Sequence, residues 1–471
     1  MDRARPGSAW DRLAAYVKER RESGKWPKDF EAFENDLHER LMAVKRDLIA
    51  EEFVRADEQA DAIEVEGTIY RRVVRCEDTY FTTAGPVRAM RSLYKNRADE
   101  HSRSICPMEL RLGLIQARWT PAAAKQASWV VSQLTPGVAE ELFKRMGNMT
   151  PSKATLDRLP KQLHDVWEAE RLDFEAALRA SDIVPAETAT VAVSLDGVLA
   201  PMIDGKRAEK RGEAAARGEI AKGPAGYREV GCGTVSMYDA EGELLRVIRM
   251  ARMPESKKET LKEMLTKELA IVLKERPGVN LVKIADGAKD NWEFLSNALP
   301  GGIEVLDFFH AAEHLAAALG NAYGDGSIEA RNHFDTKRRI LREDPAGVDK
   351  VIQSLAYLTK KHPRNVAIAR ALGYFRTNRS RMRYADIAAQ NLPIGSGIVE
   401  ASCKTLVGQR LKLSGMRWSV DGGQAILNLR AWHQSDRFDR AWALIAAEYK
   451  AEITVIANVI NLHNELRSAR Q

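Results

Sequence analysis

The spacing of apolar and polar positions changes several times along the chain, and each change marks a different predicted segment. Residues 8 to 55 carry apolar positions three and four apart among many charges, which predicts a solvent-exposed helical pair. From Tyr70 to Lys95 the pattern alternates and breaks at Ala84-Gly85-Pro86, which predicts a β-hairpin. We assign residues 1–60 to a helical arm, structural or oligomerising, and residues 61–110 to a small β-hairpin element whose basic side is a candidate DNA contact.

Three Thr-Pro pairs follow at a regular spacing of 15 residues, at Thr120, Thr135 and Thr150. Threonine caps the free amides of a first helical turn, and proline suits the first helical position, so each pair predicts a helix start. The third helix opens with Lys153 and Thr155, whose side chains would suit the major groove of DNA. Residues 111–184 are therefore a candidate helix-turn-helix DNA-binding region, and a plain three-helix bundle is the alternative.

Pro160 predicts the end of this third helix, and a long charged helix is expected over about 161–181. Beyond Pro185, strands and helices alternate. Apolar stretches predict strands within residues 188–202, 226–239, 243–253, 280–288 and 303–310, and helices over 255–276 and 290–299. The order β-β-β-α-β-α-β predicts an α/β domain with a mixed sheet over residues 185–310, and it is the order of the ribonuclease H fold.

Two of these strands are expected to end in Asp-Gly, at Asp196 and Asp286. A charge at the end of a buried strand costs several kcal/mol unless something compensates it, and metal coordination is one compensation. In this strand order the first and fourth strands are neighbours, so the two carboxylates are expected to converge. Glu400 offers a third, because Gly395-Ser396-Gly397 predicts a helix start that places Glu400 in the first turn, with Lys404 one turn further on the same face. An ordinary turn is the alternative at each Asp-Gly.

Composition narrows the class of protein. With 471 residues, of which 45% are hydrophobic, the chain is long enough for two or three domains. The 72 Lys and Arg against 66 Asp and Glu give a net charge of +6, which leans toward polyanionic partners. Four cysteines lie far apart with no CxxC pair, which argues against a disulfide framework or a cysteine zinc site. With no signal-peptide core and no run of about 18 apolar residues, we expect a cytoplasmic protein without a membrane span.

The stretches VSLDG, IADGAKDNWEFL, LDFFHAAEHL and GSGIVEASCKTLVGQRLKLSGMRWS resemble the DDE transposases of bacterial insertion sequences, most closely the ISKra group. The resemblance extends from about Ile105 to Trp432, and its last stretch is long and specific. It implies that Asp196, Asp286 and Glu400 are the catalytic and metal-binding acids of a ribonuclease H-like domain. Mg²⁺ is the implied cofactor, with two ions in each active site and Mn²⁺ able to substitute.

The spacing of the acids divides the rest of the chain. Asp286 lies 90 residues after Asp196, and Glu400 lies a further 114 residues on, which is a long interval. We therefore interpret residues 311–392 as a helical basic insertion, residues 393–435 as the second part of the catalytic domain, and residues 436–471 as a helical tail. The resemblance implies DNA as partner, both transposon ends and target, a homodimer or higher oligomer on paired ends, and a bacterial, nucleoid-associated location.

Cations surround Glu400 and fill the second half of the insertion. From Thr359 to Tyr384 there are eight bases and no acid, a composition that favours a surface following a DNA backbone over a merely solvated face. Ten residues are candidate DNA contacts: Lys153, Thr155, Lys404, Arg410, Lys412, Arg417, Arg376, Arg379, Arg381 and Arg383. Asp307, His310 and Trp418 are candidate accessory residues.

Two further functions compete with a transposase. His310 to His314 match H-x-x-E-H, the pattern of a zinc peptidase with two histidine ligands and a glutamate base, but a third ligand is missing from the pattern. A domesticated or repressor-like DNA-binding protein could also use this scaffold without cutting. The presence of all three acids favours an enzyme that hydrolyses a phosphodiester at the transposon end and then joins the 3′-OH to target DNA.

Overall fold

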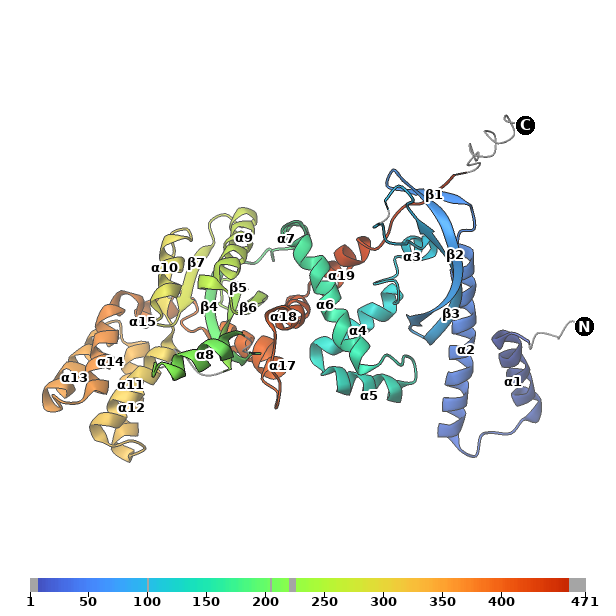
Figure 1. The fold of residues 1–471 in the computed structure, drawn as a ribbon. Coiled ribbons are helices and arrows are strands. Elements are labelled where there is room, and N and C mark those ends of the chain that lie inside the picture. Colours follow the sequence, from blue (N-terminus) through green and yellow to red (C-terminus); the bar gives the residue numbers. More distant parts are fainter. Residues whose placement is uncertain (1–6, 100, 204–205, 220–225, 457–471) are drawn as a thin grey trace, which may run out of the picture. The chain divides into compact units, whose positions relative to one another are not determined.

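The computed structural model describes residues 7–99, 101–203, 206–219 and 226–456, and the chain forms two compact units. One unit comprises residues 1–171 together with 439–471, and the other comprises residues 172–438 (Figure 1). In the described part of the chain, no helix combines the length and the apolar character needed to cross a membrane.

The first unit joins a four-stranded sheet to seven helices. Its helices are α1 (Ala9–Ser23), α2 (Phe30–Ala56), α3 (Pro107–Leu112), α4 (Pro121–Gln133), α5 (Pro136–Met146), α6 (Lys153–Ala169) and α19 (Phe438–Ala447). Its strands are β1 (Ala62–Val65), β2 (Thr68–Thr82), β3 (Gly85–Lys95) and β9 (Thr454–Val455), in the order β3-β2-β1-β9. The predicted helical pair and the hairpin are both present, with Thr82 opposite Gly85 at the turn.

The end of the chain departs from the predicted helical tail. Within residues 436–456, which the structure describes, the helix is confined to Phe438–Ala447, and Thr454 and Val455 pair with β1 as an additional strand. A two-residue strand gives almost no alternating pattern in the sequence, and it forms because β1 would otherwise be an unpaired sheet edge. The remainder of the predicted tail, residues 457–471, lies outside the described residues.

The Thr-Pro pairs begin two helices as predicted, because Pro121 and Pro136 are the first residues of α4 and α5. The third helix begins two residues after Pro151, where Ser152 caps it by accepting a hydrogen bond from the Thr155 amide. The prediction that Pro160 ends this helix is wrong, since α6 continues to Ala169. Pro160 is buried on the apolar face of α6, and this burial offsets the cost of about 3 kcal/mol for proline inside a helix.

The second unit is built on a five-stranded mixed sheet. Its strands are β4 (Thr190–Pro201), β5 (Tyr227–Tyr238), β6 (Leu244–Arg252), β7 (Asn280–Ala285) and β8 (Ile303–Leu306). Their order across the sheet is β6-β5-β4-β7-β8, where β4, β7 and β8 run parallel and β5 runs antiparallel to both of its neighbours. This confirms a mixed α/β domain with β4 and β7 adjacent, an arrangement compatible with a ribonuclease H-like fold.

Helices cover both faces of this sheet (Figure 1). On one face, α9 (Glu259–Glu275) follows the short turn η1 (Ser256–Lys258) and packs its leucines against the strands. Gly233 permits this approach, because a Cβ there would lie 2.9 Å from a methyl group of Leu265. On the other face lie α16 (Gly397–Ser402), the π-helical segment η3 (Cys403–Gly408), α17 (Gln409–Leu411) and α18 (Val420–Gln434). The sheet with its strand ends is thereby held between two apolar layers.

Between β8 and α16 the chain is helical, as predicted for the insertion. Its elements are α11 (Phe308–Tyr323), α12 (Ile328–Glu343), α13 (Gly347–Lys361), α14 (Val366–Thr377), η2 (Arg379–Arg381) and α15 (Tyr384–Ala388). These helices pack against one another at one side of the sheet (Figure 1). This unit also contains α10 (Lys289–Asn297), as predicted, and α8 (Lys206–Ala216), which the sequence did not indicate.

The boundary of the second unit lies earlier than the predicted residue 185. The helix α7 (Arg171–Ala180) leads into Asp182, whose carboxylate pairs with Arg246 of β6 at 2.6 Å and with Arg437. Arg437 in turn donates to Glu268 of α9 at 2.7 and 2.8 Å. This buried network joins residues far apart in the sequence, so the boundary could not be found from local composition.

Candidate active site

Asp196 lies in β4 just beyond the point where β7 stops pairing with that strand. The parallel pairing runs from Thr190 to Ser194, opposite Asn280 to Ile284. The prediction that the strand ends at Asp196-Gly197 is wrong, because β4 continues to Pro201. Over these last residues it pairs with β5 on its other side. The long partner strand supplies backbone hydrogen bonds that keep β4 extended beyond the acid. The carboxylate therefore stands at an edge that opens between β4 and β7.

The half-buried Asp196 carboxylate has two hydrogen-bond donors. Its Oδ1 accepts from the Gly197 amide at 2.6 Å, and its Oδ2 accepts from the Cys403 thiol at 3.7 Å. Burial raises the pKa of Asp196, and the negative charge of Asp286 raises it further against the opposing effects of Gly197, Lys258 and Cys403. The pKa of the Cys403 thiol is itself raised, by its hydrogen bond with Cys232 and by burial, so the thiol remains protonated as a donor.

Asp286 follows the last residue of β7 and is fixed by the turn into α10. Its Oδ1 accepts from the Ala288 amide and from the Asn291 side chain, both at 3.1 Å, while its carbonyl accepts from the indole of Trp292 at 2.6 Å. Gly287 is packed against the insertion, because a Cβ there would lie 2.3 Å from the ring of Tyr374. The position of this acid thus depends on both β7 and α14.

Glu400 lies in the first turn of α16, as the Gly-Ser-Gly motif predicted. Ser396 donates its hydroxyl to Glu400 Oε1 at 2.7 Å. Burial raises the pKa of Glu400, and the nearby carboxylates of Asp307 and Asp196 raise it further against the effect of Ser396. The helix then changes to π-helical geometry at Cys403, a local irregularity that is frequent at functional sites.

Asp307 braces the segment that leads into α16. The side chain is 1% exposed, and its Oδ1 accepts from the amides of Phe309 and Ser396 at 3.3 and 3.0 Å. Its Oδ2 accepts from the amide of His310 at 3.1 Å, so one carboxylate caps α11 and anchors the loop before Glu400. Asp307, one of the candidate accessory residues, therefore holds the loop that precedes Glu400.

The three predicted acids come from β4, the end of β7 and α16, and the fold brings them to one edge of the sheet. Asp196 interacts electrostatically with both Asp286 and Glu400, which lie 90 and 204 residues further along the chain. Carboxylate oxygens are the hard ligands that Mg²⁺ prefers, so the three side chains have the chemistry expected of metal ligands. Among the residues that the structure describes, however, no three His, Cys, Asp or Glu side chains form a group that could hold a metal ion.

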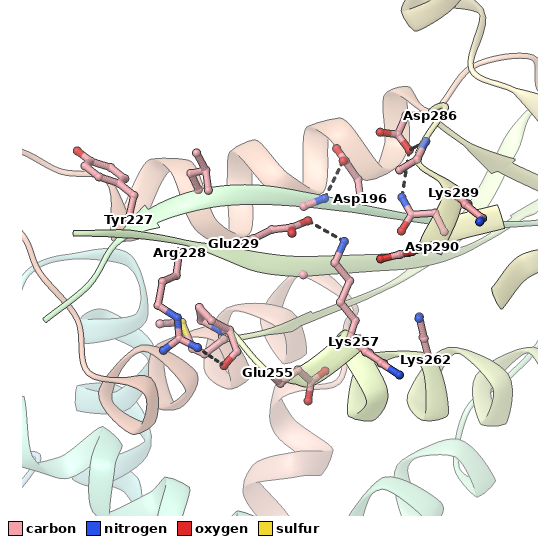
Figure 2. A pocket seen from close by; sticks show the side chains of 18 residues that line it. Asp196, Tyr227, Arg228, Glu229, Glu255, Lys257, Lys262, Asp286, Lys289 and Asp290 are labelled. Carbon is pink, nitrogen blue, oxygen red and sulfur yellow. Dashed lines mark hydrogen bonds and ion pairs between the residues drawn. The ribbon is translucent and has the colours of Figure 1, made fainter. Parts of the chain in front are cut away.

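A hollow of about 800 Å³ opens beside Asp196 and Asp286 (Figure 2). Its far wall is formed by the turn Lys257-Lys258 before α9, and its end is formed by Tyr227 and Arg228 at the start of β5. Figure 2 shows the two aspartates on one side of this space and Lys257 and Lys262 on the other. The acids therefore border a cavity that is open to solvent and lined largely by charged side chains.

The cations around Glu400 separate into exposed and buried residues. Lys404, Lys412 and Arg417 are exposed and remain candidate DNA contacts. Arg410 is only 1% exposed, with its guanidinium 5.2 Å from the ring of Trp418. The prediction that Arg410 contacts DNA is not supported, because a buried guanidinium cannot reach a phosphate without a rearrangement.

Trp418 has a structural position rather than a place beside the acids. Its indole donates to the carbonyl of Leu411 at 3.0 Å, and its backbone exchanges hydrogen bonds with Pro201 and Ile203 after β4. The long loop from α17 is thereby tied to the end of the strand that carries Asp196.

Three of the four arginines selected in the insertion already have acidic partners. Arg379 pairs with Asp349 at 2.5 and 2.9 Å, and Arg383 pairs with Asp386 at 2.7 Å. Arg381 pairs with Glu304 of β8 at 2.7 Å and lies 4.0 Å from the ring centroid of Trp292. Arg376 is exposed, and no ion pair is found for it among the described residues. Three of the eight bases in this tract are thus paired with acids from outside it.

The histidines of the H-x-x-E-H pattern occupy different environments. His310 is partly exposed near Glu313, whereas His314 stacks on Tyr374 with 3.9 Å between ring centroids. Burial lowers the pKa of His314, and the neighbouring His310 lowers it further. No third metal ligand joins this pair within the described residues, and the pattern is accounted for by packing between α11 and α14.

Lys153 and Thr155 lie at the start of α6 in the first unit. Lys153 is exposed, while Thr155 is half-buried with its hydroxyl 2.9 Å from that of Ser152. Cys403 and Tyr374 are site residues that sequence reasoning had not selected for the active site. Cys403 could have been noticed one helical turn from Glu400, but the contact of Tyr374 with Gly287 arises only from tertiary packing.

Comparison with known proteins adds little to this geometry. No model of a protein family matches the sequence, and no curated protein matches it. Among solved structures, the chain is similar to the Drosophila P element transposase strand transfer complex, with 14% identity over 74% of this chain and 86% of that chain. The TM-score of that similarity is 0.25, so the function has to be argued from the site itself.

Proposed function

We propose that this protein is a DNA transposase of the DDE type, with Asp196, Asp286 and Glu400 as its catalytic acids. The observation that carries the proposal is that burial and the charge of Asp286 raise the pKa of Asp196, while burial and the charges of Asp307 and Asp196 raise the pKa of Glu400. Acids with raised pKa values near an open cavity are typical of functional sites.

The three acids are the residues that would hold Mg²⁺, since each offers carboxylate oxygens at this edge. A bound ion would supply activation of water and stabilisation of charge on the phosphoryl group. The chain's own residues have separate tasks: Asn291 and Ala288 orient Asp286, Cys403 donates to Asp196, and Ser396 holds Glu400. Asp307 fixes the loop before Glu400, so the third acid is aimed by a buried hydrogen-bond network.

The proposed substrate is the phosphodiester backbone of DNA at a transposon end, followed by target DNA for joining of the 3′-OH. Exposed Lys404, Lys412 and Arg417 next to Glu400 would contact its phosphates. In the first unit, Lys153 and Thr155 would read base edges as part of a helix-turn-helix. We further propose a homodimer or higher oligomer, since joining two ends requires at least two active sites.

Cleavage of an end-containing duplex in Mg²⁺ or Mn²⁺ tests the enzyme. Asp196→Asn and Asp286→Asn should each abolish cleavage, because each removes a ligand charge while keeping size. Asp290→Asn is the matched control, since Asp290 is an exposed acid that lines the same hollow without belonging to the trio. Equal activity of all three variants would remove the proposal and leave a DNA-binding protein without cleavage activity as the better account.

End recognition has its own test. Lys153→Ala combined with Thr155→Ala should weaken binding to the specific end more than binding to random duplex, because base contacts carry specificity and phosphate contacts do not. Competition gel shifts with the two DNAs measure the ratio of the affinity for the specific end to the affinity for random duplex. Equal losses on both would return α4, α5 and α6 to a plain helical bundle.

A further inference from the structure

The hollow beside the acids extends well beyond them. Pairing between β4 and β7 ends at Ser194, and the next backbone partner of β4 on that side is Trp418, which bonds to Pro201 at the end of the strand. The space along this edge reaches from Asp196 and Asp286 to Tyr227, at the start of the neighbouring strand β5 (Figure 2). Of the three proposed catalytic acids, Asp196 and Asp286 line one end of this cavity, and its remaining walls have no role in the proposed cleavage.

Lysines form the wall opposite the aspartates. Lys257 and Lys258 have φ values of 47° and 55°, a left-handed conformation that residues with side chains rarely adopt. Lys258 is held by Glu229 at 2.8 Å. Lys257 and Lys262 also line the hollow, and neither forms an ion pair with any described residue. Two consecutive strained residues thus carry lysines at the cavity wall, and strain of this kind clusters at functional sites.

Two acids of the lining, Glu229 and Glu255, lie near these lysines, and Glu229 forms an ion pair with one of them. Glu229 is engaged with Lys258, and Glu255 accepts from the amide of Leu261 at 3.0 Å. The other acids, including Asp196 and Asp286, lie across the cavity (Figure 2). The hollow therefore presents Lys257, Lys258 and Lys262 to an anion on one side, and aspartates together with Lys289 on the other (Figure 2).

An aromatic ring is exposed at the end of the hollow away from Asp286. Tyr227 is 44% exposed, which is unusual for a tyrosine on a strand of a packed sheet, and Arg228 lies next to it with a hydrogen bond to the Pro254 carbonyl at 3.5 Å. Exposed aromatic rings beside cationic grooves are the common means of holding single-stranded nucleic acid, because bases stack on the ring and phosphates meet the cations.

We propose that this hollow binds a short single-stranded segment of DNA that continues from the cleaved phosphodiester, with its phosphates at Lys257 and Lys262 and a base stacked on Tyr227. The inference rests on the proposed transposase function and assigns the path of one strand past the acids. A volume of about 800 Å³ is that of a small-ligand pocket, so it accommodates part of one strand and not a duplex. Stacking on Tyr227 likewise requires a base that is not paired.

Binding of a fluorescein-labelled oligo(dT) of about 15 nucleotides, followed by anisotropy in EDTA, tests the site without requiring cleavage. Tyr227→Ala should weaken binding about tenfold through lost stacking, whereas Tyr227→Phe should retain it. Lys257→Gln combined with Lys262→Gln should lower the log-log salt slope by about 1.4, since each phosphate contact to a single strand contributes about 0.7. Neither set of changes touches the three acids.

Matched controls come from the same unit. Lys267→Gln alters an exposed lysine of α9 that pairs with Glu263 and does not line the hollow, and Tyr357→Ala removes an exposed tyrosine of α13. Both controls should bind as the wild-type protein does. The inference is overturned if Tyr227→Ala matches Tyr357→Ala and the lysine pair matches Lys267→Gln, or if wild-type protein does not bind the oligonucleotide.

The proposed strand-binding site and the proposed transposase activity can be refuted independently of each other. Wild-type cleavage that depends on Asp196, together with unchanged oligo(dT) binding by the Tyr227 and lysine variants, would keep the transposase and remove this site. Loss of oligo(dT) binding by those variants, with no metal-dependent cleavage by the wild-type protein, would keep a strand-binding hollow and remove the transposase. Reduced binding together with cleavage that favours ends carrying a single-stranded overhang supports both.

Discussion

The carboxylates at the sheet edge and the arginines of the insertion were both selected for their charge, yet the fold treats them in opposite ways. Asp196 and Glu400 are brought toward other acids, and their pKa values rise. Arg379, Arg381 and Arg383 are each brought to a carboxylate. Like charges that a fold leaves close together indicate a site for a ligand of opposite charge. Charges that the fold pairs stabilise the structure, and they can bind DNA only by giving up their acidic partners.

The largest effect is expected at the repelled charges. Glu400→Gln keeps the size of the side chain and should lower Mg²⁺-dependent cleavage by at least about 10³-fold. The same change should raise the free energy of unfolding in EDTA only slightly, because it removes a carboxylate near Asp307 and Asp196, but Glu400 is exposed and solvent screens the repulsion. Strand cleavage and urea unfolding measure the two effects. Retained cleavage would make Glu400 a surface residue like any other.

Affinity for DNA provides the second half of that test. Glu400→Gln and Asp196→Asn should bind duplex DNA in Ca²⁺ as tightly as the wild-type protein or more tightly, since a carboxylate repels phosphate. A gel shift measures this. A parallel loss of binding and cleavage would instead indicate that these substitutions damage the fold.

At the paired charges the expected effect is on stability. Arg381→Gln removes the ion pair with Glu304 and the contact with Trp292, and both partners are mostly shielded from solvent. We expect a loss of about 2 kcal/mol in the free energy of unfolding, much of it from leaving Glu304 without its partner. Adding Glu304→Gln should recover part of that loss in a double-mutant cycle. The salt dependence of DNA binding should not change.

The contributions of the two regions to folding stability should also change with pH in opposite directions. The raised pKa values of Asp196 and Glu400 mean that these carboxyls hold their protons more tightly in the folded state than in the unfolded state. Their ionisation therefore destabilises the folded protein as pH rises above the ordinary carboxyl pKa. Burial acts to raise the pKa of Glu304, but hydrogen bonds from Ser296 and Arg381 lower it overall. The stabilising contribution of Glu304 is therefore present above the ordinary carboxyl pKa and is lost as pH falls.

Urea unfolding in EDTA from about pH 4 to about pH 8 separates these contributions. Asp196→Asn and Glu400→Gln should gain stability over the wild-type protein mainly at the high end of this range. Glu304→Gln should lose stability at the high end and approach the wild-type value as pH falls. Stability changes of the same sign at high pH for the variants of both regions would contradict the contrast between repelled and paired charges.

The smallest effect distinguishes the free arginine from a paired one. Arg376→Gln should flatten the log-log salt slope of duplex binding by about 0.9 if it meets one phosphate. Arg379→Gln should change the slope less, because Arg379 would have to exchange Asp349 for the phosphate, and its side chain, 62% exposed, should give no resolvable change in stability. An equal slope change for both would mean that DNA competes freely for the paired arginines.

Local pattern was enough to find most elements of this protein. The amphipathic arm, the hairpin at Gly85, the helices after Pro121 and Pro136 and the strand order of the second unit all follow from periodicity and from the residues that begin and end helices. The placement of β4 beside β7 followed from topology, because a β-β-β-α-β order leaves few positions for the fourth strand. Pro160 was misjudged, since its burial within α6 depends on partners outside the local window.

What the sequence determined about the proposed site is which acids are its candidates and which elements carry them. Tertiary structure alone decided which charges are paired, because Asp349 and Glu304 lie 30 and 77 residues from their arginines. The burial of Arg410, the thiol of Cys403 beside Asp196, and the lysine wall facing the aspartates were decided in the same way. The reason is physical: the free energy of a charge depends on the distance to its neighbours and on its exposure to water, and both are set by the folded chain and not by proximity in sequence.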